Sequence, residues 1–123
     1  MGKKSAGERL TVKAFFEKIK SFEDSEEIVF EVQMTNKFKK SIDLSYARNF
    51  NLQLLLEVIE LLAKNKKLSK KYYPHELKGQ YKGVFECHIN PDWLLMWEED
   101  KNKLVLLLLN TATHADFTGK KRV

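Results

Sequence analysis

Residues 83–110, GVFECHINPDWLLMWEEDKNKLVLLLLN, decide the fold because they hold the strongest strand pattern in this 123-residue chain. Strand-like runs at 83–89, 93–98 and 103–110 are joined by two short links of turn-forming residues, which is typical of β-hairpins. The unbroken apolar run at 104–109 is typical of a strand that is covered on both faces and lies centrally in its sheet. We therefore expect a three-stranded antiparallel meander.

The segment before the meander predicts one strand and two helices. Apolar residues alternate over 28–34, which is typical of a strand. Thr35 is a favourable N-cap for a first helix, and Asn51 for a second helix, whose leucines form a wide apolar stripe over 52–63. We predict an α+β fold in which strand, helix and helix precede the meander, with the helices packed on one face of the sheet.

Residues 1–27 are predicted to form an N-terminal extension of a domain that spans 28–123. Phe15 and Ile19 are among several apolar residues that recur at helical spacing, so one amphipathic helix is expected there, before an acidic run at 23–27. This extra helix either caps the sheet or lies loose beside it.

Composition and charge narrow the class of protein. The 43% hydrophobic and 32% charged residues fit a soluble globular domain, and no apolar run has the length of a membrane span. A single cysteine cannot form an internal disulfide, so we expect a cytoplasmic protein. The whole net charge of +5 lies within 28–123, where sixteen basic side chains face eleven acidic ones. This excess favours a polyanionic partner, although surface lysines also serve solubility, and both explanations stay open.

The three histidines, His75, His88 and His114, all fall in the second half of the chain. Imidazole titrates near neutral pH and is the commonest group in acid–base catalysis. A lone histidine beside a strand is more often structural, so the grouping is what matters. His88 precedes a turn that is followed by Asp92 and Trp93, which brings an imidazole, a carboxylate and an aromatic surface to one end of a hairpin. That combination suits RNA, with its phosphates and flat bases.

The predicted hairpins also give an expected register. A first hairpin that is symmetric about its Asn-Pro turn places His88 opposite Trp93. A second hairpin centred near Asp100 places Trp93 opposite Leu107 or Leu108. His114 would then lie too far along the last strand to join the site, unless the chain turns back.

The lysine-rich segment 64–71 leads into this region and is either a solvated loop or a contact to a phosphate backbone. Tyr73 follows it and precedes Pro74. Because the residue before proline avoids helical torsions, Tyr73 is expected to be extended.

Several motifs occur together, in one order, in the second half of the chain. They are HELKG at 75–79, YKG at 81–83, ECHI at 86–89, PDWLL at 91–95, LLLL at 106–109 and TATH at 111–114. With them the chain resembles the YafQ branch of the RelE-type toxins over residues 28–118, in the same order of elements. The resemblance implies a RelE-like fold and a toxin of a bacterial type II toxin-antitoxin system that acts as a ribosome-dependent mRNA endoribonuclease.

The same resemblance implies which residues form the site. The catalytic residues would be His75, His88, Asp92 and His114, with Trp93 as a supporting aromatic residue. We further predict that Lys78, Lys82, Trp93 and Phe117 bind RNA. His114 would be the leading acid–base group, with His88 or Asp92 as its counterpart, while His75 positions phosphate or shares in proton transfer. The implied reaction needs neither metal nor cofactor. A base takes the proton of the ribose 2′-hydroxyl, the oxygen attacks the adjacent phosphate, and an acid protonates the departing 5′-oxygen.

Alternatives remain at several of these positions. Lys78 and Lys82 either offset charge on the phosphate in the transition state or are ordinary surface lysines. Trp93 either stacks on a base or anchors the core of the hairpin. A zinc site made of the three histidines and Asp92 is a further alternative, although these residues lack a tight ligand spacing.

The chain departs from the family pattern at two expected arginines. Phe85 and Asn110 stand where many relatives carry arginine, a side chain that grips phosphate in a fixed fork. The departure predicts reduced activity and leaves open a non-catalytic RNA- or ribosome-binding module, a catalytically weakened homologue of the toxins.

The resemblance also implies partners. They would be a cognate antitoxin of the DinJ or RelB type, the ribosome and its mRNA, and operator DNA only through the antitoxin, with no membrane. Residues 12–22 and 28–32 distantly resemble the tail of a DinJ-type antitoxin, which would make the extension a fusion remnant. A separate hypothesis is that the extra helix covers part of the toxin in cis.

Overall fold

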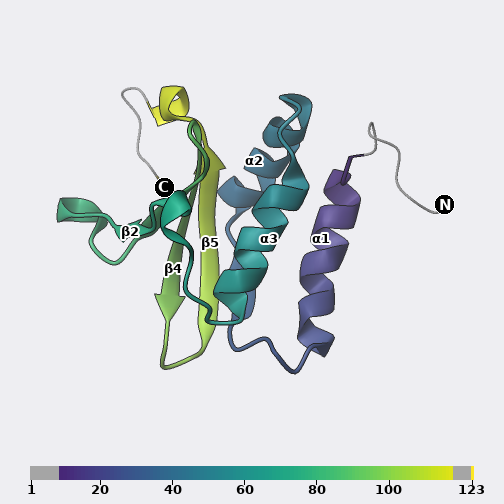
Figure 1. The fold of residues 1–123 in the computed structure, drawn as a ribbon, viewed down its shortest axis with the longest axis vertical. Coiled ribbons are helices and arrows are strands. Elements are labelled where there is room, and N and C mark those ends of the chain that lie inside the picture. Colours follow the sequence, from purple (N-terminus) through teal and green to yellow (C-terminus); the bar gives the residue numbers. More distant parts are fainter. Residues whose placement is uncertain (1–8, 118–122) are drawn as a thin grey trace.

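The computed structural model describes residues 9–117 and Val123. Its helices lie together on one face of a single sheet (Figure 1). The helices are α1 (Val12–Ser21), α2 (Asn36–Ala47) and α3 (Leu52–Ala63), and the strands are β1 (Glu31–Met34), β2 (His75–Glu76), β3 (Phe85–Asn90), β4 (Trp93–Asp100) and β5 (Val105–Ala112). The strand order is β1-β5-β4-β3-β2. The predicted α+β class and meander are confirmed, and the two-residue strand β2 is an addition that no periodic pattern indicated.

The two predicted N-caps start the central helices. Thr35 Oγ1 accepts a hydrogen bond from the backbone N–H of Phe38 at 3.0 Å, and Asn51 Oδ1 accepts one from Gln53 at 3.0 Å. Each cap satisfies a backbone donor that has no partner within its own helix. Leucines from most of the circumference of α3 are buried, so this helix forms the middle of the core.

The N-terminal helix α1 is packed into the molecule. Thr11 caps it through a 3.1 Å hydrogen bond from Ala14, and Phe15 and Ile19 are 0% and 4% exposed. Figure 1 shows α1 alongside α3, on the far side of α3 from β4. The extension therefore shares the hydrophobic core of the helical layer.

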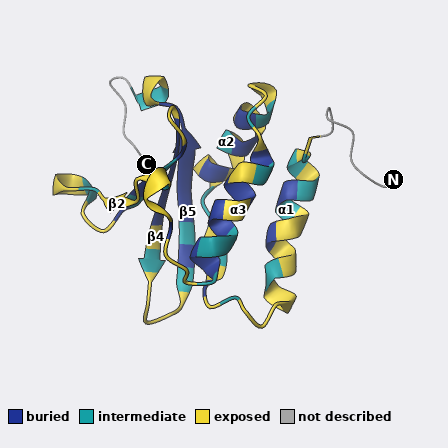
Figure 2. Ribbon diagram, viewed as in Figure 1, coloured by how far each residue is buried: buried dark blue, intermediate teal, exposed yellow. Residues whose placement is uncertain are grey.

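Strand β5 is an interior strand, as its run of leucines predicts. It pairs in parallel with β1, where Met34 lies beside Leu108, and antiparallel with β4. Leu106 and Leu108 pack under the helices, whereas Leu109 belongs to a second apolar cluster on the opposite face. Buried residues follow the length of β5 in Figure 2.

Both predicted hairpin registers are wrong. In the first hairpin Asn90, not His88, lies opposite Trp93, because a bulge between His88 and Asn90 shifts the pairing. In the second hairpin the turn occupies 101–104, later than expected, and a bulge between Met96 and Trp97 shifts the register further, so Leu94 pairs with Ala112. His114 therefore lies only two residues after Ala112, which pairs with Leu94. This places His114 at the same end of the sheet as the β3–β4 turn.

None of the described helices combines the length and the apolar composition needed to cross a membrane.

Candidate active site

The β3–β4 turn and the end of β5 meet at one rim of the sheet. Strand β3 carries His88, the turn carries Asp92, and the short 3-10 helix η4 (His114–Phe117), which follows β5, begins with His114. Asn90 closes the turn, because its Oδ1 accepts a 3.1 Å hydrogen bond from the backbone N–H of Asp92. Strand pairing thus brings His114 beside Asp92, 22 residues earlier in the sequence, and beside His88.

Asp92 holds His114 through two contacts to one carboxylate oxygen. The backbone N–H of His114 lies 3.2 Å from Asp92 Oδ1, and the ring Nδ1 of His114 lies 3.0 Å from the same oxygen. The hydrogen bonds from the side chain and then the backbone of His114 hold the pKa of Asp92 below its usual range, so the carboxylate is ionised and accepts. A neutral imidazole that donates through Nδ1 carries its lone pair on Nε2, where it can take a proton.

The ring of His88 lies between two other rings. Its centroid is 5.7 Å from that of His114, with planes 46° apart, and 5.9 Å from that of Tyr73, with planes 59° apart. His88 is half-buried, whereas Tyr73 is exposed. Tyr73 was not among the predicted site residues, and its place beside His88 depends on the fold of the segment before β2.

His75 reaches the same region through Tyr73. Its ring Nδ1 donates to the backbone carbonyl of Tyr73 at 2.8 Å, and its Nε2 lies 3.4 Å from Glu86 Oε1, an ion pair that forms only when the imidazole is protonated. The pairing of β2 with β3 sets His75 beside Glu86. Both nitrogens of His75 thus face protein groups, unlike those of a ring that points freely into solvent.

The two predicted base-stacking residues are not free aromatic surfaces. Trp93 is 0% exposed and packs against Phe50, with ring centroids 4.9 Å apart. The prediction that Trp93 contacts RNA is therefore wrong, because its side chain faces the helices, and its alternative role as a core anchor holds. Phe117 is half-buried against the apolar cluster that includes Leu94 and Met96.

The predicted RNA-binding lysines, Lys78 and Lys82, are exposed on the loop between β2 and β3. Leu77 anchors this loop by donating to the carbonyl of Val84 at 2.8 Å. Leu77 and Tyr81 of the same loop pack against the second apolar cluster, so the loop is held at the edge of the sheet formed by β2 and β3.

The two positions where the family resemblance predicts arginine hold side chains that contact other parts of the protein. Phe85 stacks on Trp97, with centroids 5.9 Å apart. Asn110 is 3% exposed, and its Oδ1 accepts hydrogen bonds from Ser41 at 2.7 Å and from the N–H of Thr111 at 2.9 Å. Phe85 therefore takes part in packing, and Asn110 in hydrogen bonds within the protein.

An arginine that the sequence did not indicate lies near the rim. Arg48, at the end of α2, makes two hydrogen bonds to Asp116 in η4, and Asp116 Oδ2 also accepts from the backbone N–H of Thr113 at 2.9 Å. The charge of Asp92 also acts on Arg48 and helps to raise its pKa, after the larger effect of Asp116. Nothing local in the sequence links residues 68 positions apart.

Cys87, within the ECHI motif, faces the helices and is 0% exposed. Burial first, and then the charge of Glu86, raise the pKa of its thiol to about 12. The thiol is therefore no nucleophile at neutral pH.

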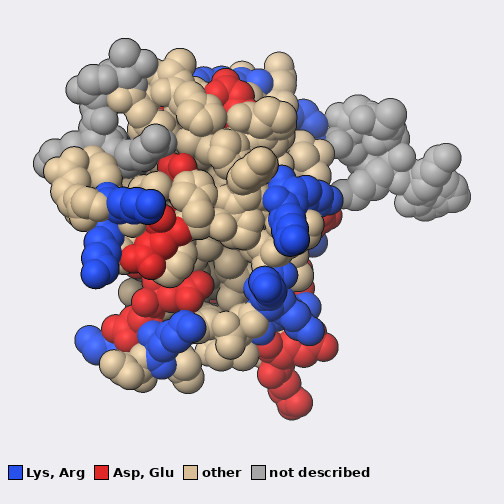
Figure 3. Space-filling model, turned by 60° about the vertical axis from the view of Figure 1, so that its left-hand side comes forward, with Lys and Arg blue, Asp and Glu red and all other residues tan. Residues whose placement is uncertain are grey.

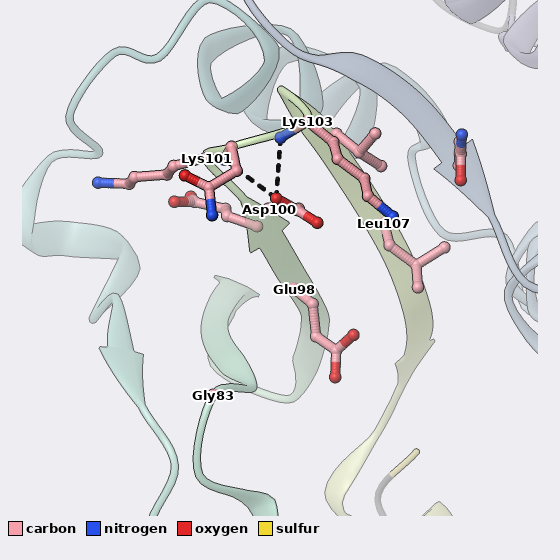
Figure 4. A pocket seen from close by; sticks show the side chains of 10 residues that line it. Gly83, Glu98, Asp100, Lys101, Lys103 and Leu107 are labelled. Atoms are coloured by element: carbon pink, nitrogen blue, oxygen red, sulfur yellow. Dashed lines mark hydrogen bonds between the residues drawn. The ribbon is translucent and has the colours of Figure 1, made fainter.

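A hollow of about 680 Å³ lies at the opposite end of β4 and β5. Glu98, Glu99 and Asp100 line it, and Asp100 accepts hydrogen bonds across the turn from the N–H groups of Asn102 and Lys103 (Figure 4). Figure 3 shows acidic side chains gathered on this side of the molecule, between groups of lysine and arginine. Lys101 and Lys103 also line the hollow, so its three carboxylates, which repel phosphate, are only partly offset by positive charge.

The zinc alternative requires at least three ligands at one point. Among the residues that the structure describes, no three histidine, cysteine, aspartate or glutamate side chains form such a group.

Comparison with known proteins identifies the family. The family described as the bacterial toxin of type II toxin-antitoxin system, YafQ, matches residues 30–119. The chain belongs to the YafQ toxin family. The mRNA interferase toxin YafQ of Escherichia coli K12 is 30% identical over 91 residues, which are 72% of this chain and 96% of the relative.

Solved YafQ-like structures agree with the fold. YafQ from E. coli BL21(DE3) superposes with a TM-score of 0.66 at 26% identity, over 71% of this chain and 96% of that one. YafQ in the E. coli DinJ-YafQ toxin-antitoxin complex gives 0.66 at 27% identity, over 73% and 98%. A metal-bound toxin from Helicobacter pylori gives 0.66 at 34% identity, over 70% and 96%. The YafQ resemblance and the RelE-like fold are confirmed, and α1 lies before the residues that match the family.

Proposed function

We propose that this YafQ-family chain is a ribosome-dependent mRNA endoribonuclease that cuts by metal-independent acid–base transesterification. The observation that carries the proposal is the contact between His114 Nδ1 and Asp92, made beside the ring of His88. The name mRNA interferase, which the E. coli relatives bear, supports the class of reaction.

In this mechanism Asp92 orients His114, and His114 and His88 exchange protons with the RNA. The carboxylate fixes the Nδ1–H tautomer, which leaves Nε2 to take the proton of the ribose 2′-hydroxyl. The 2′-oxygen then attacks the adjacent phosphate, and the second imidazole protonates the departing 5′-oxygen. The ring centroids, 5.7 Å apart, allow the two imidazoles to flank one phosphate. The products are a 2′,3′-cyclic phosphate and a 5′-hydroxyl.

Charge on the phosphate needs a cationic partner in the transition state. With Phe85 and Asn110 in the places of arginine, we assign this role to Lys78 and Lys82, and to His75 when its ring is protonated. Ammonium groups bind phosphate as point charges and lack the guanidinium fork, so cleavage slower than that of arginine-bearing relatives follows.

A toxin that cuts cellular mRNA requires a neutralising partner. The DinJ-YafQ complex shows such a pairing for the E. coli relative. We infer a cognate antitoxin of the DinJ or RelB type for this chain, which would act with the ribosome in the cytoplasm and reach operator DNA only through that antitoxin.

The test is induction in a bacterial host, with and without the neighbouring gene, while the 5′ ends of translated and untranslated transcripts are mapped. The proposal expects growth arrest and new ends on translated messages only, both suppressed by the antitoxin. Cleavage of untranslated messages as well would contradict the proposed dependence on the ribosome.

Matched variants separate a nuclease from the non-catalytic binding module. Removing an acid–base group costs about 10²- to 10⁴-fold in rate, so His114→Ala should abolish both cleavage and growth arrest. Asp92→Asn removes the carboxylate that orients His114. Its control is Glu98→Gln, which likewise neutralises an exposed carboxylate, but at the far end of the sheet. If His88→Ala and His114→Ala arrest growth as the wild type does, the binding module is the better description.

A further inference from the structure

We propose that Tyr73 is the surface on which a base of single-stranded RNA stacks at this site, a role that rests on the nuclease proposed above. The side chain is 72% exposed, more than the other exposed large apolar side chains in the described part of the chain. Its ring lies against His88, 5.9 Å between centroids, so a base on its outer face would sit next to the proposed proton-transfer groups.

The backbone of Tyr73 holds the ring outward. Its φ and ψ are both 50°, in the left-handed region, although the residue precedes Pro74 and an extended conformation was expected. A bulky side chain rarely adopts this conformation without a compensating constraint. Two hydrogen bonds constrain the backbone of Tyr73. Its N–H donates to the carbonyl of Lys70 at 3.0 Å, and its carbonyl accepts from His75 Nδ1 at 2.8 Å.

The surroundings favour RNA as the occupant. The exposed Lys70 and Lys71 lie three and two residues before Tyr73, in the 3-10 helix η2 (Lys70–Tyr72). His75 and His88 contact Tyr73 directly. Binding of single strands combines cationic side chains along the backbone with aromatic rings that take unstacked bases. Since Trp93 is buried, Tyr73 supplies the exposed ring in contact with His88.

Three substitutions in the full-length protein separate the effect of the Tyr73 ring from that of its backbone conformation. Tyr73→Asn removes the ring and keeps a residue that tolerates the left-handed conformation, whereas Tyr73→Phe keeps the ring. Leu104→Asn is the matched control, because Leu104 is also exposed and left-handed, with φ 56°, but lies in the turn at the other end of β4 and β5. Thermal unfolding of each variant checks that the fold is kept.

The measurement is the affinity for a single-stranded RNA with 2′-O-methyl riboses, which cannot be cleaved, both free and as a ribosome-bound message. Cleavage of the unmodified message is followed in parallel. Loss of one stacked base should weaken binding by about 5- to 150-fold in Tyr73→Asn, while Tyr73→Phe and Leu104→Asn bind as the wild type does.

The possible outcomes distinguish failure of the stacking role from failure of the proposed nuclease function. If Tyr73→Asn binds and cleaves as the wild type does, stacking is overturned while the nuclease stands. If Tyr73→Asn loses affinity only for the antitoxin, the ring is a protein contact and the inference is likewise overturned. If the wild type neither binds nor cleaves either RNA, the nuclease proposal fails and the stacking role fails with it.

Discussion

Arg48 forms a bidentate ion pair with Asp116. Nη1 lies 2.9 Å from Oδ2 and Nη2 lies 3.0 Å from Oδ1, which joins the end of α2 to the short helix that begins with His114. The hydrogen bond from Arg48 is the largest cause that holds the pKa of Asp116 well below its usual range. The pair therefore fixes the segment that presents His114 to Asp92.

Breaking this pair should impair catalysis more than stability. Both side chains are partly exposed, so Arg48→Ala should lower the free energy of unfolding by only about 1 kcal/mol. Misplacing His114 should slow cleavage by about 10- to 100-fold. Urea unfolding and single-turnover cleavage measure the two effects. Lys64→Ala, which breaks the ion pairs with Glu27 and Glu60, is the control and should leave cleavage unchanged. Equal slowing in both variants would refute the positioning role.

The same pair makes stability depend on acid pH. The folded-state pKa of Asp116 is depressed below the unfolded value, so its contribution is complete above the unfolded pKa and disappears as pH falls through the lower folded one. Between about pH 5 and pH 2 the wild type should therefore lose more unfolding free energy than Asp116→Asn does. Denaturation curves at a series of pH values test this, and parallel losses in the two proteins would count against it.

Trp93 should behave as a core residue. Its side chain is fully buried, and its Nε1 has no hydrogen-bond partner among the described residues. Trp93→Ala should cost about 3–5 kcal/mol of unfolding free energy, because it leaves a large cavity. Trp93→Phe keeps most of the packing and removes the unpaired donor, so it should cost much less and leave RNA affinity intact. An affinity loss in a stably folded Trp93→Phe protein would restore the base-stacking prediction.

The N-terminal helix should stabilise the fold without covering the site. Phe15 is 0% exposed in the core that α1 shares with α3, so Phe15→Ala should cost about 3–5 kcal/mol. Cleavage per folded molecule should stay unchanged, because α1 lies on the helical layer and the histidines lie at the rim of the sheet. Increased specific activity in Phe15→Ala would indicate cover in cis instead.

The sequence predicted elements better than register. The caps Thr35 and Asn51 and the leucine run of β5 follow local rules, and all three were found where expected. The hairpin registers were wrong because a bulge after His88 and a long turn at 101–104 leave no periodic signal.

The arrangement of the candidate site could be predicted from the sequence only in part, for the same reason. His88, Asp92 and His114 were predicted from motifs. Their meeting at one rim depends on the register of β5 with β4, which places Ala112 opposite Leu94. Arg48 and Tyr73 were missed because their positions depend on contacts between distant segments and on one unusual backbone conformation.

The most direct test of the account is the chemistry of the ends that the purified protein leaves on ribosome-bound mRNA. Proton transfer by His114 and His88 through the ribose 2′-oxygen predicts a 2′,3′-cyclic phosphate on one fragment and a 5′-hydroxyl on the other, absent with His114→Ala. A 3′-hydroxyl with a 5′-phosphate, or the same ends at the same rate from His114→Ala, would contradict it.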